Sequence, residues 1–144
     1  MIESDTIKLL RECDAGVKMG VASIDEVLDH VADNRFRQRL LACKQGHEDL
    51  DNRIQALLER YHDEGKNPDP VAKGMSWVKT NWKLHMDGSD EAIADVMTDG
   101  CSMGVKSLHK YLNQYEAADE ASKAIAKELI GLEEELTADI RRYL

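Results

Sequence analysis

Residues 16–24 read GVKMGVASI and residues 100–108 read GCSMGVKSL, so five of nine positions are identical at a separation of 84. The similarity continues further along the chain at a separation of 82, after a two-residue deletion. There Leu50, Ile54, Arg60 and Tyr61 correspond to Leu132, Leu136, Arg142 and Tyr143. This recurrence predicts an internal duplication, in which two copies of one unit are related by an approximate two-fold axis.

Each copy consists of two long amphipathic segments. Their apolar residues recur every three or four positions, which is the spacing of one face of an α-helix. Short polar turns near 32–35 and 116–120 separate the paired segments, and such turns connect antiparallel helices. The sequence therefore predicts one helical hairpin over about 4–64 and a second over about 89–144, in a single all-α domain spanning 1–144.

Capping residues predict where two of the helices begin and end. Ser89 precedes Asp90 and Glu91, and this order favours a helix N-terminus because carboxylates in the first turn interact well with the helix dipole. Gly65 stands where a C-terminal cap is expected, and prolines at 68 and 70 stop the second helix.

The crossover between the hairpins, residues 65–88, differs from the rest of the chain. Apolar spacing there predicts a short helix that carries both tryptophans, Trp77 and Trp82. Two interpretations remain open for them. They pack the crossover onto the bundle as ordinary apolar cover, or they form a lid or a contact between subunits, since tryptophans often anchor interfaces.

Composition excludes several classes of protein. The chain has 144 residues, 5% aromatic residues and a formal charge of −9, which disfavours a β-sandwich and a binder of nucleic acid or anionic membranes. It contains no apolar run long enough for a membrane span, and its N-terminus lacks the pattern of a signal peptide. Cys13, Cys43 and Cys101 form no CxxC pair and lie on apolar faces, where we expect buried, unreactive thiols. We therefore expect a cytoplasmic protein.

Two duplicated helical hairpins joined by a long crossover resemble the ferritin-like superfamily, in particular its small bacterial bundle proteins. The resemblance covers essentially the whole chain and is architectural. It implies a four-helix bundle that commonly binds two iron or manganese ions between its helices. The ligands implied are a Glu on each first helix and Glu-x-x-His on each second helix.

This chain departs from that ligand pattern. Glycines stand where carboxylates of the first helices would be needed, and the second helix reads Lys44-x-x-His47. Glu59-x-x-His62 has the right spacing but lies in the last turn, far from the centre of the bundle. We therefore expect an incomplete dinuclear site.

His47 is the polar member of an otherwise apolar helix face, and Asp51 follows one turn later. Their spacing suits two metal ligands on one helix, and a one-turn shift in register would add Asp14 and Glu133. The alternative is a half-buried, neutral histidine that is hydrogen-bonded to Asp51 or to a backbone group.

Four glycines occupy matched positions in the two first helices: Gly16, Gly20, Gly100 and Gly104. Each glycine inside a helix costs about 1 kcal/mol relative to alanine, so a compensating gain is expected. The favoured gain is close packing of these two helices across the two-fold axis. The alternative is a small-ligand pocket, because missing side chains can leave room in the core.

These observations favour a structural or protein-interaction module, forming homo-oligomers or binding a protein partner, with no cofactor. The sequence contains no pairing of a nucleophile with a base and no phosphate-binding loop, so an enzyme is the less favoured expectation. The alternative function is an iron- or manganese-binding redox or storage protein with a degenerate site near His47 and Asp51.

Overall fold

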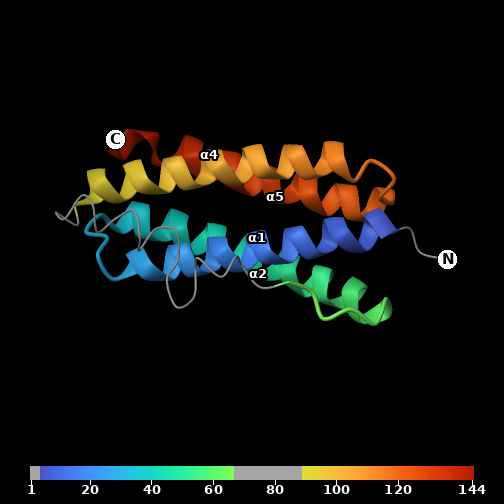
Figure 1. Ribbon diagram of the computed structural model, residues 1–144. Helices are drawn as coiled ribbons and strands as arrows, with labels where there is room; N and C mark the ends of the chain where they lie inside the picture. Colours follow the sequence, from blue (N-terminus) through green and yellow to red (C-terminus); the bar gives the residue numbers. More distant parts are fainter. Residues whose placement is uncertain (1–3, 67–88) are drawn as a thin grey trace.

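The computed structural model describes residues 4–66 and 89–144, and every regular element in them is helical (Figure 1). The helices agree with the four amphipathic segments predicted from apolar spacing. They are α1 (Ser4–Leu28), α2 (Asn34–Arg60), α4 (Asp90–Gln114) and α5 (Glu120–Ile140), followed by the short 3-10 helix η2 (Arg141–Tyr143).

The four helices pack side by side as two antiparallel hairpins. Helices α1 and α5 run in one direction, and α2 and α4 run in the other (Figure 1). At one end of the bundle, the Asp90 carboxylate accepts hydrogen bonds from the backbone N–H groups of Ala32 and Asp33. At the other end, Thr6 Oγ1 accepts one from the backbone N–H of Asp119. These bonds fasten the turn of each hairpin to the other hairpin.

Side-chain caps fix three helix starts. Asp33, Ser89 and Asp119 each have extended backbone angles and accept a hydrogen bond from the backbone N–H three residues later. Each cap satisfies a donor that the first turn of a helix leaves unpaired. The start predicted at Ser89 is confirmed, and the second turn lies close to the predicted 116–120. The first turn begins directly after Leu28, earlier than the predicted 32–35, and α2 already begins at Asn34.

The end of α2 differs from the prediction. The residue in the left-handed conformation is His62, with φ of 56°, and it directly follows the cap residue Tyr61. The backbone N–H of His62 bonds to the Glu59 carbonyl, and that of Asp63 to the Leu58 carbonyl. This pair of bonds is the Schellman motif. Gly65 also has a positive φ, of 81°, but it lies beyond the motif and does not cap the helix.

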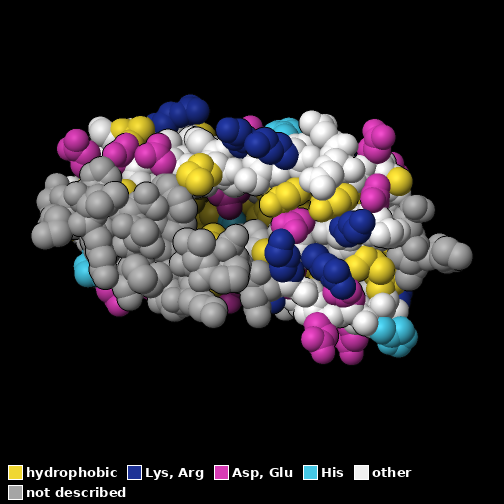
Figure 2. All heavy atoms as spheres, viewed as in Figure 1, with side chains coloured by type: hydrophobic (Ala, Val, Ile, Leu, Met, Phe, Trp, Pro, Cys, Tyr) yellow, Lys and Arg dark blue, Asp and Glu magenta, His cyan; other side chains and the backbone are white. Residues whose placement is uncertain are grey.

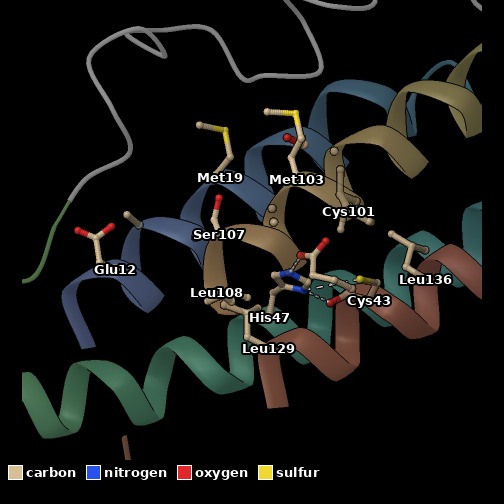
Figure 3. Close-up of a pocket in the computed structure, with 18 of the residues that line it drawn as sticks. Glu12, Met19, Cys43, His47, Cys101, Met103, Ser107, Leu108, Leu129 and Leu136 are labelled. Carbon is tan, nitrogen blue, oxygen red and sulfur yellow. Dashed lines mark hydrogen bonds and ion pairs between the residues drawn. The ribbon is translucent and has the colours of Figure 1, made fainter. Parts of the chain in front are cut away.

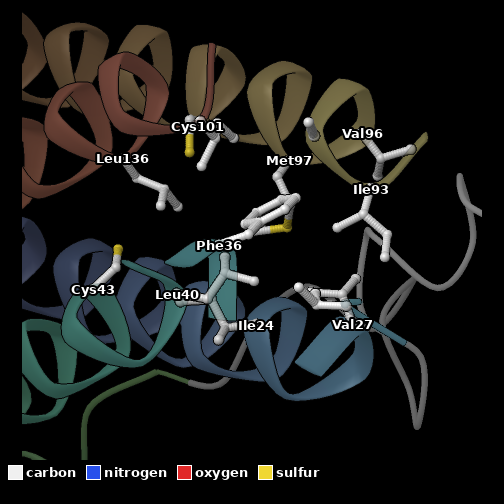
Figure 4. Packing of buried hydrophobic residues seen from close by; sticks show 13 residues of the cluster. Ile24, Val27, Phe36, Leu40, Cys43, Ile93, Val96, Met97, Cys101 and Leu136 are labelled. Atoms are coloured by element: carbon white, nitrogen blue, oxygen red, sulfur yellow. The ribbon is translucent and has the colours of Figure 1, made fainter. Parts of the chain in front are cut away.

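The buried core forms two clusters, one in each half of the bundle. The cluster that contains Phe36 and Leu40 from α2 also includes Ile93 and Met97 from α4 (Figure 4). The second cluster is built around residues such as Ile54 of α2 and again draws on all four helices. Because each cluster needs both hairpins, the hairpins stabilise one another.

The predicted crossover helix, with Trp77 and Trp82, lies outside the described residues. None of the helices in the described ranges is long and apolar enough to cross a membrane.

Candidate functional site

A cavity of about 470 Å³ lies between α1 and α4, near the middle of the bundle. Figure 2 shows the surface hollowed near the centre of this face, with hydrophobic side chains around the hollow. The glycines of both copies, Gly16, Gly20, Gly100 and Gly104, line the cavity, and its inner side is formed by residues of α2 and α5.

The glycines face side chains of the second helices of the hairpins. A Cβ atom built on Gly16 has Leu129 as its neighbour at 3.5 Å, and one built on Gly104 has Glu133 at 3.8 Å. At Gly20 the nearest atoms belong to the His47 ring, at 2.8 Å. We expected contact between the two glycine-bearing helices at these positions. The two helices do pack against each other, but their glycines lie around a cavity, which was the alternative, and Gly20 lies against a buried imidazole.

The walls of the cavity are largely apolar and rich in sulfur. Met19 of α1 and Met103 of α4 lie on the side opposite to His47 (Figure 3), and Met103 is 52% exposed. Towards one end, Glu12 accepts a hydrogen bond from Lys66 Nζ at 2.5 Å, and both residues line the cavity. Methionine side chains are flexible and polarisable, so such walls adapt to ligands of different shapes.

His47 forms the polar floor of the cavity and is only 1% exposed. Its Nδ1 lies 2.8 Å from the backbone oxygen of Cys43, and its Nε2 lies 2.8 Å from Glu133 Oε1 (Figure 3). A backbone carbonyl and a carboxylate accept hydrogen bonds, so each ring nitrogen carries a proton. The ring is therefore an imidazolium paired with Glu133.

The pKa of His47 agrees with this protonation state. Burial by itself lowers the pKa of an imidazole, but hydrogen bonds to Cys43 and Glu133 outweigh it and raise the pKa to about 10. The ring is thus charged at neutral pH, which differs from the neutral histidine weighed in the sequence interpretation. The expected hydrogen bond to a backbone group is present, to the carbonyl of Cys43.

The structure gives His47 and Asp51 different partners. Asp51 lines a separate depression between α1 and α2, where burial and the neighbouring Asp14 raise the pKa of Asp51 to about 6. Asp14 is fully buried and accepts hydrogen bonds from Lys18 Nζ, Gln55 Nε2 and the backbone N–H of Lys66. Of the residues considered for a site with His47, only Glu133 contacts it.

Within residues 4–66 and 89–144, no three His, Cys, Asp or Glu side chains are grouped so that they could hold a metal ion. A metal would have to displace a proton from His47, because both ring nitrogens point at acceptors and neither presents a free lone pair.

Two site residues carry different signals in the sequence. Cys43 precedes His47 by four residues, so their proximity on one helix face is visible in the sequence. Glu133 lies 86 positions away, and its contact with His47 depends on the register between α2 and α5. The repeat aligns Glu133 with Asp51, and a one-turn shift in register brings it to His47, but the sequence does not fix that register.

Comparison of the chain with protein-family models, with curated proteins and with solved structures gives no match.

Proposed function

We propose that this bundle binds a small, mostly apolar molecule in the cavity between α1 and α4. The single observation that carries the proposal is the cavity of about 470 Å³ with a buried, charged hydrogen-bonding pair at its floor. Pockets for small ligands are typically apolar, measure about 300–1,000 Å³ and contain a few polar groups that fix orientation.

The floor favours a ligand with a hydrogen-bond donor at one end. Glu133 Oε1 accepts from His47, whereas Oε2 points towards Gly104, 3.8 Å from a Cβ atom built there. The Glu133 side chain is 13% exposed, and a carboxylate oxygen can accept further bonds. A hydroxyl or amino group on the ligand would donate to it, and the methionine walls would hold the apolar body.

The first test uses the fluorescent probe N-phenyl-1-naphthylamine, which has an apolar body and one N–H donor. Its emission should rise on mixing with the protein and saturate at one probe per chain. In Gly104→Leu the new side chain points into the cavity, so binding should weaken about tenfold or more. Gly131→Leu is the matched control, because Gly131 is exposed and a Cβ atom there meets nothing within 4 Å.

Two results would overturn the proposal. Either the probe fails to bind the wild-type chain, or it binds Gly104→Leu and the wild type equally well while circular dichroism shows both to be folded.

We further propose that the bundle is ferritin-like and works in the cytoplasm. Support for the fold comes from the internal repeat and from the common direction of α2 and α4, which are the second and third of the four long helices. Support for the compartment comes from three buried cysteines that are all free thiols, as suits a reducing environment.

A further inference from the structure

We propose that Cys43 is a nucleophilic thiol that captures soft carbon electrophiles, such as α,β-unsaturated carbonyl compounds, that enter the cavity. The inference rests on the proposed function, because the electrophile must first occupy the same cavity. It departs from the sequence-based expectation that all three cysteines are unreactive.

The geometry around Cys43 carries the proposal. Its Sγ lies 3.6 Å from Nδ1 of His47, and Cys43 is one of the residues that line the cavity (Figure 3). The Nδ1–H group faces both the Cys43 carbonyl and this sulfur. Since the ring is held as an imidazolium by Glu133, a positive charge lies beside the thiol. A neighbouring cation stabilises the negative charge that develops on sulfur when the thiol gives up its proton and attacks a carbon electrophile.

Cys101 is an internal comparison within the same cavity. It lies on α4, and burial together with the nearby Glu133 carboxylate raises the pKa of the Cys101 thiol. A thiol beside a carboxylate keeps its proton and reacts slowly. Cys43 and Cys101 thus share one cavity but have different charged neighbours, the His47 imidazolium for Cys43 and the Glu133 carboxylate for Cys101.

Cys13 is a second comparison, outside the lining of the cavity. Burial raises the pKa of this thiol to about 12, with further contributions from the charges of Glu12 and Asp14. Of the three cysteines, Cys43 is the one that has a cation as its neighbour within the described ranges.

The proposed step is a conjugate addition. The Cys43 thiolate forms a carbon–sulfur bond with the β-carbon of the electrophile, and the electron pair of the carbon–carbon double bond moves to the α-carbon. The α-carbon then takes a proton, so that in total the thiol S–H adds across the double bond. No oxidant or further reactant is needed.

The test uses N-ethylmaleimide at low concentration, followed by peptide mapping of all three cysteines in the intact chain. We expect alkylation of Cys43 to be about tenfold or more faster than that of Cys101 and Cys13. Alkylation of the three at equal rates, or of Cys101 first, would overturn the proposal. This comparison is made within the wild-type protein and needs no variant to fold.

A pair of variants tests the role of the imidazolium. His47→Gln keeps a polar side chain but removes the charge, so alkylation of Cys43 should slow about tenfold. His109→Gln is the matched control, because His109 is exposed on α4, and its rate should equal that of the wild type. An unchanged rate in folded His47→Gln would overturn the assigned cause.

Competition separates this proposal from the proposed function. N-ethylsuccinimide has the shape of N-ethylmaleimide but cannot react, so it should slow the alkylation of Cys43 by occupying the cavity. Preferential alkylation of Cys43 without such competition would contradict occupation of the cavity and therefore both proposals, although Cys43 would still be the most reactive of the three thiols. Binding of the naphthylamine probe without preference for Cys43 would contradict the thiol proposal alone.

Discussion

Individual residues show most clearly how the two copies of the repeat differ. Gly20 and Gly104 correspond to each other, yet a methyl group at Gly20 would meet the His47 ring and one at Gly104 would meet open cavity beside Glu133. The ring cannot move aside without losing its bonds to Cys43 and Glu133. The same residue type is therefore required at one position and optional at the other.

Alanine substitution measures this difference. Gly104→Ala should raise the free energy of unfolding by about 0.5–1 kcal/mol, because alanine favours the helix and meets no close atom. Gly20→Ala should lower it by about 1–3 kcal/mol through overpacking against His47. Urea denaturation followed by circular dichroism gives both values.

Gly131→Ala calibrates the helix preference alone, since Gly131 is exposed in the middle of α5. The Gly131→Ala variant should gain the same free energy of unfolding as the Gly104→Ala variant. A Gly20→Ala variant as stable as Gly131→Ala would show that the imidazole does not hold its place.

The charge on His47 predicts a pH dependence of stability. The pKa of His47 is raised to about 10 in the folded chain, from 6.5 for an ordinary histidine, so folding favours the protonated ring. Its contribution is fully present below about pH 6.5 and is lost as pH rises through 10. It is on the order of a few kcal/mol, and unfolding in urea at a series of pH values should reveal it.

His47→Gln provides the comparison, because glutamine does not titrate. The stability of the variant should change less than that of the wild type between pH 6.5 and 10. Parallel curves for the two proteins, or an imidazole that titrates near pH 6.5 by NMR, would contradict the ion pair.

Among the helices, the sequence-based prediction and the structure differ at the C-terminal end of α2. Gly65 is the residue that a pattern-based prediction selects, because glycine adopts positive φ freely. The helix ends three residues earlier, where the Schellman hydrogen bonds require a left-handed residue and the chain provides His62. Local composition cannot reveal this, since the hydrogen bonds of the last turn decide where the helix stops.

His62→Gly should therefore stabilise the protein by about 1 kcal/mol, since a non-glycine residue pays a penalty in the left-handed region. Thermal unfolding followed by circular dichroism would detect the change.

The control is His109→Gly, the same substitution at a helical position of α4, which should destabilise the protein by about 1 kcal/mol. If both variants are destabilised alike, the conformation assigned to residue 62 is wrong.

Apolar spacing predicts the helices well because each one buries a continuous face. The hairpins, the turns and the cap at Ser89 follow from patterns within about thirty residues of chain. The cavity does not follow, because it consists of atoms missing from two helices 84 positions apart. For its polar floor the sequence selects His47 and admits Glu133 as a partner, but it cannot fix their contact, because the two residues come from different hairpins.

At the scale of the whole molecule, the polar layer divides the core. The Phe36 cluster fills one half of the bundle and the Ile54 cluster fills the other. Between them lie the ion pair and the cavity, at the level of the four glycines. A buried ion pair stabilises a protein less than well-packed apolar side chains of similar volume would. The apolar clusters on either side of this layer therefore provide most of the stability of the bundle.

The ion pair also breaks the approximate two-fold symmetry that the sequence repeat predicts. In the repeat His47 corresponds to Leu129, and Glu133 corresponds to Asp51, so the second copy has no equivalent pair. An exactly two-fold symmetric cavity would offer a ligand two equivalent binding positions and would not distinguish between its two ends. Under the proposed function, the single polar end of the cavity therefore favours one orientation of a bound ligand and one ligand per chain.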